Sequence, residues 1–258
     1  MSRIITGLIL IGIGWYVLTN GGLPLMVFLT LIGVVAFYEI QQMIPLSSPW
    51  LAGSNMLLYV AGMGYLYRSG ALLSGGYVAI TLILFSIFLY EFLTKTLVFQ
   101  SRPLLNNLKY FGYVSIGFSA IYLIRMSEQG ALYIGILFLS IWATDIFAYY
   151  GGRALGQRPL SPISPKKTIE GTVIGVASAA VMMGGVAWVY SLSWWVVVLA
   201  IGIGLMGQLG DLYESLIKRT YNVKDSSNLL PGHGGVLDRA DSSLFVAPLL
   251  YVVIILLL

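Results

Sequence analysis

The sequence has no cysteine and a single histidine, His233, among its 258 residues. Without cysteine there are no disulfides, thiolate metal sites or cysteine nucleophiles, and one histidine excludes chemistry that needs two imidazoles. Charge is scarce as well: Asp, Glu, Lys and Arg make up 9% of the residues, whereas soluble domains carry about 25%. These shortages exclude a soluble globular protein.

Long hydrophobic runs fill most of the chain instead. Hydrophobic residues account for 58% of it and the mean hydropathy is +0.89, while one membrane-spanning helix needs about 20 mostly apolar residues. Turn-forming residues divide the sequence into nine apolar runs, at about 4–18, 23–38, 50–67, 71–93, 110–124, 131–150, 169–190, 194–217 and 242–258. The predicted fold class is all-α, a polytopic integral membrane protein with about nine transmembrane helices.

The distribution of lysine and arginine predicts an orientation. Nine spans place the two termini on opposite sides, and 12 of the 14 basic residues then fall on the side of the N-terminus. The other side keeps only Arg68 and Arg125. The positive-inside rule therefore predicts a multi-pass membrane protein with its N-terminus in the cytoplasm and its C-terminus outside.

Charged residues are concentrated in the second half of the chain. Seven of the ten acids and eight of the 14 bases lie between Asp145 and Asp241. We therefore expect residues 1–130 to form transmembrane scaffold helices. Glu39 and Glu91 are the two acidic residues of this part that do not fit a purely structural role. Residues 131–258 are expected to form a transmembrane catalytic region, with a polar cavity among the C-terminal helices.

Several of these charges stand within or at the ends of the expected spans. A carboxylate that faces lipid costs about 2.5–3.5 kcal/mol, so Asp145, Asp211 and Glu214 should face a wet or protein-lined cavity. Asp211, Glu214, Ser215 and Lys218 are spaced i, i+3, i+4 and i+7, which places them on one face of a helix. The alternative is that these are helix-end charges that reach the interface, and that Glu214 only pairs with Lys218.

The segment 161–171 is rich in serine, proline and lysine. Ser164-Pro165 is typical of an N-cap followed by proline at the first helical position, which would place Lys166 and Lys167 in the first helical turn. Because the helix dipole disfavours cations there, we expect a phosphate group to offset them. A loop that binds anionic lipid headgroups is the alternative.

The stretch 218–241 is the most polar in the sequence. It combines several cations, a glycine-rich turn and spaced carboxylates, three features of sites that handle polyphosphates with Mg²⁺. Asp211 and Asp238 stand in the two flanking helices, on the same side of the membrane. We expect these two carboxylates to bridge metal ions.

At this point the sequence resembles a known family, the phosphatidate cytidylyltransferases or CDP-diacylglycerol synthases. Ser215-Leu216-Ile217-Lys218-Arg219, Lys224-Asp225 and Leu230-Pro231-Gly232-His233-Gly234-Gly235-Val236-Leu237-Asp238-Arg239-Ala240-Asp241 match its signature at every fixed position, over residues 215–241. The likeness extends upstream through 208–211, 164–171 and 145–152. It covers about the C-terminal 115 residues well, and the first half only as a set of hydrophobic spans.

The resemblance implies a homodimeric enzyme of the inner membrane that joins CTP to phosphatidic acid, and no nucleic-acid partner. Mg²⁺ is the implied cofactor, with K⁺ as a second candidate ion. The implied catalytic residues are Asp211, Asp238, Lys218 and Arg239. The implied substrate-binding residues are Lys166, Lys167, Ser215, Arg219, Lys224, Asp225, His233, Gly234 and Gly235. The implied metal ligands are Asp211 and Asp238, with Asp145 and Asp241 as further candidates.

Other readings remain open on the residues alone. A polyprenol or phytol kinase and a cytidylyltransferase for ether lipids would share CTP and differ in the acceptor. A cation transporter could also place Asp145, Asp211 and Asp238 in a polar cavity, although it would not need the glycine-rich turn beside a lysine-rich loop. A CDP-alcohol phosphotransferase is disfavoured because its D-G-x-x-A-R pattern is absent.

Overall fold

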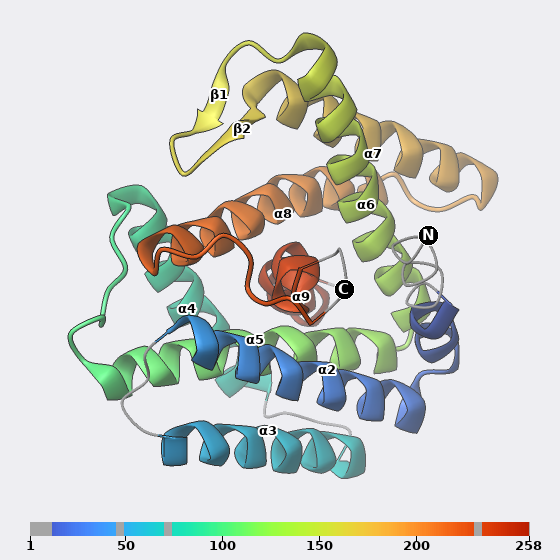
Figure 1. Ribbon diagram of the computed structural model, residues 1–258. Helices are drawn as coiled ribbons and strands as arrows, with labels where there is room; N and C mark the ends of the chain where they lie inside the picture. The colour runs from blue at the N-terminus through green and yellow to red at the C-terminus, as the bar shows by residue number, and fades with distance from the viewer. Residues whose placement is uncertain (1–11, 45–48, 70–73, 230–233, 258) are drawn as a thin grey trace.

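The structure is a computed structural model that describes residues 12–44, 49–69, 74–229 and 234–257. Residues 12–20 are helical. The helices that follow are α2 (Gly22–Met43), α3 (Pro49–Ser69), α4 (Ser74–Thr94), α5 (Pro103–Met126), α6 (Gly130–Leu155), α7 (Ile169–Val189), α8 (Trp195–Thr220) and α9 (Leu237–Leu257). One hairpin, β1 (Pro159–Ser161) and β2 (Ser164–Thr168), stands between α6 and α7 (Figure 1).

Within the described part of the chain, six helices are long and apolar enough to cross a membrane. Their spans are Gly22–Met43, Gly75–Thr94, Gly130–Leu155, Ile169–Val189, Trp195–Thr220 and Leu237–Leu256. The prediction of an all-α polytopic membrane protein is confirmed. The helices also follow the order of the expected spans, with α3 and α5 at the third and fifth positions.

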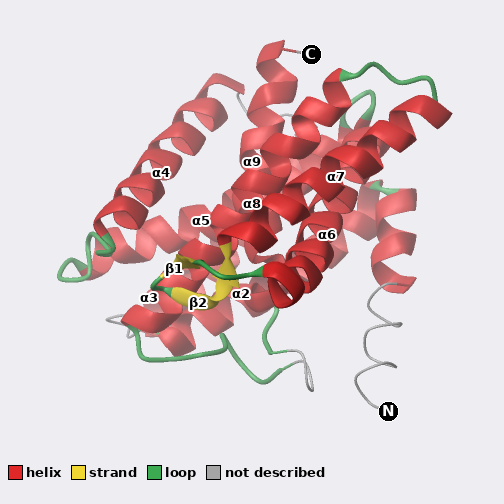
Figure 2. Ribbon diagram, turned by 90° about the horizontal axis from the view of Figure 1, so that it is seen from above, coloured by secondary structure: helices red, strands yellow, loops and turns green. Residues whose placement is uncertain are grey.

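Helix α9 lies at the centre of the helical assembly. Figure 1 looks down this helix, with α8 on one side of it and α5 on the other, and both helices pack against it. Helices α2 and α3 form a layer beyond α5, while α6 and α7 form a closely packed pair beside α8 (Figures 1 and 2). Helix α9 is therefore packed between α5 and α8, with α4 and α6 as further neighbours.

Aromatic packing fixes α8 against its neighbours. The ring of Phe88 on α4 lies 4.5 Å from that of Tyr213 on α8 and 5.5 Å from that of Tyr113 on α5, measured between centroids. Phe245 of α9 completes the cluster, with its ring centroid 6.0 Å from that of Phe88. Such contacts contribute about 0.5–1.5 kcal/mol per pair beyond burial. These ring contacts hold α8, which carries the polar face, against α4, α5 and α9.

A buried ion pair is joined to this cluster through Tyr213. The Lys109 ammonium is 2.8 Å from the Glu91 carboxylate, and both side chains are about fully buried. Glu91 also accepts hydrogen bonds from the Tyr213 hydroxyl at 2.7 Å and from the Val98 amide at 2.6 Å. This network joins α4, α5 and α8 to the loop after α4.

We expect Lys109→Met to destabilise the protein by about 3–5 kcal/mol, because it leaves the Glu91 carboxylate buried without its cation. Thermal unfolding of the detergent-purified protein measures the effect. Lys95→Met makes the same change at an exposed lysine of the neighbouring loop and should leave the melting temperature unchanged. Equal melting temperatures for the two variants would refute the structural role of the pair.

The helix start predicted at Ser164 is wrong. Residues Ser164–Thr168 form β2, which pairs antiparallel with β1 in a register of Ser161 with Ser164 and Pro159 with Thr168. Prolines at 159, 162 and 165 explain the extended backbone, since each disfavours helix in the residue before it. Helix α7 begins at Ile169, where the Thr168 hydroxyl caps it by accepting from the Gly171 amide at 3.1 Å.

This correction moves Lys166 and Lys167 from a helical turn onto a strand. The first turn of α7 holds Glu170 instead, which accepts from the Arg158 guanidinium at 2.8 Å and from the Gln157 and Arg158 amides. The first turn therefore holds no lysine whose charge a phosphate would have to offset, so a phosphate is no longer expected at this helix N-terminus. The hairpin is held to the start of α7 by Glu170, and its lysines are free to reach another element.

Candidate active site

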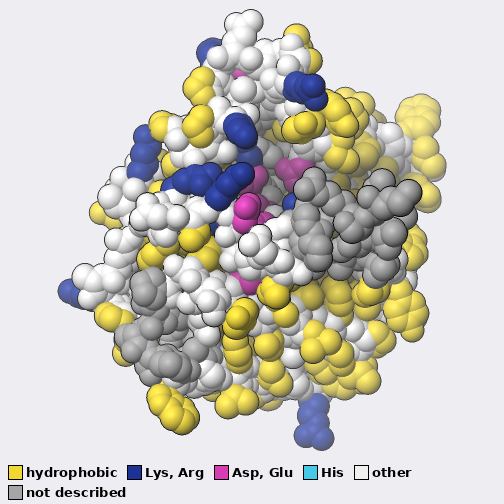
Figure 3. Space-filling model, viewed as in Figure 1, with side chains coloured by type: hydrophobic (Ala, Val, Ile, Leu, Met, Phe, Trp, Pro, Cys, Tyr) yellow, Lys and Arg dark blue, Asp and Glu magenta, His cyan; other side chains and the backbone are white. Residues whose placement is uncertain are grey.

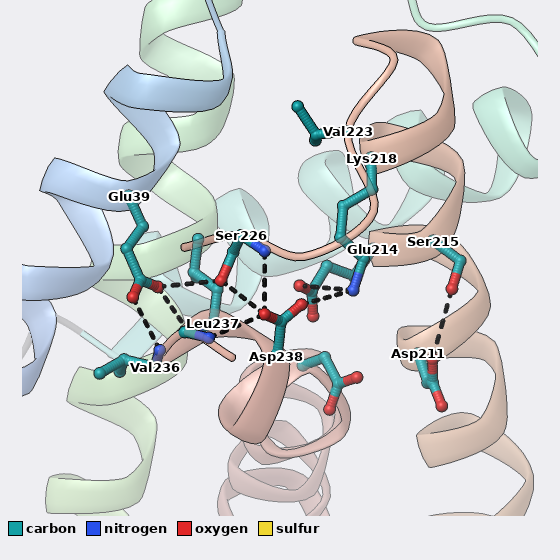
Figure 4. Close-up of polar contacts among 12 residues, drawn as sticks. Glu39, Asp211, Glu214, Ser215, Lys218, Val223, Ser226, Val236, Leu237 and Asp238 are labelled. Atoms are coloured by element: carbon teal, nitrogen blue, oxygen red, sulfur yellow. Dashed lines mark hydrogen bonds and ion pairs between the residues drawn. The ribbon is translucent and has the colours of Figure 1, made fainter. Parts of the chain in front are cut away.

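The C-terminal half of α8 carries the polar face that its spacing predicts. Figure 3 shows acidic side chains gathered near the middle of one face of the molecule, with lysine and arginine side chains beside them and hydrophobic ones over the lower part. Figure 4 shows Asp211, Glu214, Ser215 and Lys218 on α8, next to the loop that leads into α9. Two groups of contacts connect this face to the neighbouring elements.

The first group joins α8 to the hairpin and to α6. The Lys167 ammonium of β2 forms an ion pair with the Asp211 carboxylate. Lys167 also donates to the Gln208 side-chain oxygen at 3.3 Å, and the Gln208 amide donates to Asp145 on α6 at 3.0 Å. The Asp211 side chain is 30% exposed, so this group is reached from solvent.

The second group joins α8 to α9. The Lys218 ammonium lies 2.6 Å from the Asp238 carboxylate and 3.2 Å from that of Glu214. The predicted i, i+4 pair of Glu214 and Lys218 is therefore confirmed, although Lys218 has the shorter contact with Asp238. All three side chains are mostly buried. Lys218 thus links two carboxylates from two helices.

Asp238 also organises the glycine-rich turn before α9. Its second carboxylate oxygen, Oδ2, accepts from the Ser226 amide, the Ser226 hydroxyl and the Gly235 amide, each at 2.9 Å. Gly234 has φ = +79°, a conformation that favours glycine. A Cβ on Gly235 would stand 1.9 Å from the Ser226 hydroxyl and 2.6 Å from a Glu39 carboxylate oxygen. The turn has room for no side chain at this position.

We expect Gly235→Ala to displace the Ser226 segment, because the added methyl group has nowhere to go. Overpacking of this kind costs about 1–3 kcal/mol, and it should lower the melting temperature in detergent. Gly185→Ala places the same methyl group on α7 with no neighbouring atom within 4 Å. Because alanine is favoured over glycine inside a helix by up to about 1 kcal/mol, that control should be at least as stable as the unaltered protein. A Gly235→Ala variant as stable as the unaltered protein would contradict the packing described.

The other predicted residues differ in burial and in their contacts. Ser215 donates to Asp211 at 3.5 Å, and Asp241 accepts from the Ser242 amide at 2.6 Å. Asp241 also interacts electrostatically with Asp211, Lys167 and Asp145. The exposed members are Lys166, Arg219, Lys224, Asp225 and Arg239. His233 lies outside the described residues, and its predicted role stays a prediction.

At the centre of the site, carboxylates outnumber ammonium groups, which bears on the implied Mg²⁺. Five carboxylates, those of Asp145, Asp211, Glu214, Asp238 and Asp241, share the two ammonium groups of Lys167 and Lys218. Carboxylate oxygens are the donors that Mg²⁺ prefers, so the donor chemistry fits. Within the described ranges, however, no three acidic or histidine side chains come together as a ready metal site. The two predicted ligands, Asp211 and Asp238, each hold a lysine.

A comparison with known proteins identifies the family. The model of the cytidylyltransferase family matches residues 1–257. The chain belongs to the cytidylyltransferase family. It is therefore a nucleotidyltransferase, and the six long apolar helices found among its described residues make it a multi-span membrane enzyme.

Individual cytidylyltransferases resemble the chain along almost its whole length. A phosphatidate cytidylyltransferase of Staphylococcus saprophyticus is 37% identical over 273 residues, which cover 98% of each chain. One of Bacillus subtilis is 34% identical over 259 residues, with 97% of this chain and 96% of the relative covered. One of Synechocystis is 47% identical over 132 residues, which cover 50% of this chain and 45% of that relative. The bacterial relatives and the spanning helices fit a protein of the cell membrane.

Some residues of this candidate site carry no prediction from the sequence. Gln208 links Lys167 to Asp145. It stands in segment 208–211, which resembles the family, but it is not among the site residues that the resemblance implies. Ser226 and Ser227 were part of the polar loop without an assigned contact. Glu39, placed in the scaffold half, reaches both serines and the start of α9. A lone carboxylate in an apolar span is itself a signal of such a role.

Proposed function

We propose that this cytidylyltransferase transfers the cytidylyl group of CTP to phosphatidic acid and releases pyrophosphate. The relatives named phosphatidate cytidylyltransferase along the full length of the chain support this substrate pair. The observation that carries the proposal is the polar face of α8, where Lys167 and Lys218 approach from two directions among five carboxylates. Such a face suits the meeting of two polyanions and a cation.

The reaction needs alignment more than covalent help from the protein. An oxygen of the phosphatidic acid phosphate forms a bond to the α-phosphorus of CTP, and the bond from that phosphorus to the bridging oxygen breaks. The bridging oxygen leaves with pyrophosphate and keeps the electron pair. Since a phosphate monoester is already ionised near neutral pH, no side chain has to remove a proton. The ammonium groups of Lys167 and Lys218 would neutralise charge on the reacting phosphates.

Asp211 and Asp238 are the proposed holders of Mg²⁺, with Asp145 and Asp241 as further ligands. When bound, the ion would supply positive charge to the phosphate oxygens. Asp211 is the more accessible ligand, because its carboxylate is 30% exposed and its partner Lys167 lies on the hairpin. K⁺ is a proposed second ion. The exposed Lys166, Arg219, Lys224 and Arg239 are proposed to bind substrate phosphates at the rim.

We also propose the assembly and placement that go with this reaction. The enzyme acts as a homodimer, with its N-terminus and the opening of the site on the cytoplasmic side. CTP then enters from water while the acyl chains stay in the bilayer. Residues 1–130 serve as scaffold and residues 131–258 as the catalytic region.

A substrate-exchange assay tests the proposed function. Detergent-purified protein is supplied with Mg²⁺ and CTP, and with phosphatidic acid, phytol or dolichol as acceptor. We expect pyrophosphate release and CDP-diacylglycerol with phosphatidic acid alone. Phosphorylation of phytol or dolichol, with CDP as the other product, would identify a lipid kinase and overturn the proposal.

A further inference from the structure

We infer that Glu39 of α2 is a positioning residue for the proposed cytidylyl transfer. Its buried carboxylate holds the Ser226–Ser227 segment and the start of α9 together, and through them sets the position of Asp238. The inference rests on the proposed function. It adds to the site a residue of the half of the chain that was expected to be scaffold.

Glu39 is fully buried. It accepts four hydrogen bonds, two from the Ser226–Ser227 segment and two from the backbone at the start of α9. The Ser227 hydroxyl and the Val236 amide donate to Oε1 at 2.6 and 2.8 Å. The Leu237 amide and the Ser226 hydroxyl donate to Oε2 at 2.8 and 3.2 Å. Figure 4 shows the Glu39 side chain extending from α2 towards these groups.

The chemistry of these four donors explains why a charge is tolerated at this depth. All four are uncharged, so the carboxylate is stabilised by hydrogen bonds and by the positive end of the α9 dipole. Val236 and Leu237 stand where the amides of a helix have no intrahelical acceptor. Glu39 therefore caps α9 from another helix. Removal of its carboxylate would take this acceptor from the two amides and from the Ser227 hydroxyl, whereas the Ser226 hydroxyl would keep Asp238.

The same contacts couple Glu39 to Asp238. The Ser226 hydroxyl lies 3.2 Å from Glu39 and 2.9 Å from Asp238. Since a hydroxyl carries one hydrogen, it donates to one carboxylate at a time, and the two carboxylates share it as their common neighbour. The absent side chain of Gly235 leaves room for Glu39 and Ser226 to approach. If Glu39 is lost, the loop moves and Asp238 loses the donors that orient it towards Lys218.

Glu39→Gln tests this inference with almost no change in volume. A serine hydroxyl can turn to accept from the new NH₂ group, but a backbone amide cannot, so the hydrogen bond from Val236 or the one from Leu237 is lost whichever way the group points. We expect kcat to fall about 10–100-fold while KM for CTP changes less than about threefold, because alignment rather than binding is affected. Glu91→Gln is the control for a buried carboxylate elsewhere. It should lower the melting temperature but keep kcat within about twofold.

A second variant and a structural readout complete the test. Ser227→Ala removes one donor to Glu39, so it should lower kcat in the native background and have no further effect in the Glu39→Gln background. Amide hydrogen exchange at Val236 and Leu237 should become at least about tenfold faster in Glu39→Gln. Ser227→Ala also keeps the inference falsifiable if Glu39→Gln fails to fold.

The possible outcomes separate this inference from the proposed function. If the native protein makes CDP-diacylglycerol and Glu39→Gln and Ser227→Ala both keep the native kcat, Glu39 has no positioning role. If kcat falls by the same factor in Glu91→Gln and Glu39→Gln, the effect is one of general stability and the inference is also wrong. If the native protein makes no CDP-diacylglycerol, the proposed function fails, and unchanged amide exchange in Glu39→Gln would then overturn the contact itself.

Discussion

Asp211→Asn should lower turnover of CTP and phosphatidic acid by about 10²–10³-fold, the range for loss of one strong electrostatic group at a reaction centre. The change removes the charge that pairs with Lys167 and that is proposed to hold Mg²⁺. Stability should change by no more than about 1 kcal/mol, because both side chains are partly exposed. Pyrophosphate release and thermal unfolding, measured on the same preparation, report the two effects.

A matched control separates this effect from a change in total charge. Glu128→Gln also replaces one carboxylate by an amide, at an exposed position in the turn between α5 and α6. Its turnover should equal that of the native enzyme. If Asp211→Asn keeps more than about half of the native activity, the assignment of Asp211 to the reaction is wrong.

Asp238→Asn should reduce both activity and stability. The native carboxylate pairs with Lys218 through one oxygen and accepts three hydrogen bonds through the other. An amide must turn its NH₂ group towards either the ammonium or the three donors, so one set of contacts is broken. For a mostly buried pair this costs about 3–5 kcal/mol, and we expect turnover to fall by about 10²–10³-fold as well.

A double variant distinguishes the two roles of Asp238. Lys218→Met in the Asp238→Asn background removes the unpaired ammonium and should restore part of the stability, since replacing both partners of a buried pair is less costly than removing one. Activity should stay low, because the proposed metal ligand is still absent. Recovery of activity together with stability would show that the pair has a structural role only.

The sequence predicted the membrane helices well because their signal is local. Six of the apolar runs correspond, among the described residues, to helices with the length and hydropathy of a span, and α7 begins at Ile169 as its run predicts. The shared face of Asp211, Glu214 and Lys218 follows from helical spacing alone. The start at Ser164 failed because proline supports both a first helical turn and an extended strand. The decision between them came from the pairing of β2 with β1 and from the Thr168 cap.

Contacts between distant parts of the chain could not be derived from spacing. Lys167 and Gln208 are 41 residues apart, and Glu39 is 187 to 198 residues from its four partners. These pairs depend on how α2, α8 and the hairpin pack around α9. The resemblance to cytidylyltransferases named Lys167 and Asp211 as site residues, and the structure brings them into contact. Glu39 required the structure, because its partners are backbone amides and serines.

The proposed meeting of metal, nucleotide and carboxylate is tested most directly by binding of Mn²⁺ in place of Mg²⁺. Electron paramagnetic resonance of free Mn²⁺ is recorded as the purified protein is titrated in the presence of CTP. We predict saturable binding to the native protein and to Glu128→Gln, and its loss in Asp211→Asn. Equal Mn²⁺ binding by Asp211→Asn and the native protein would contradict the account.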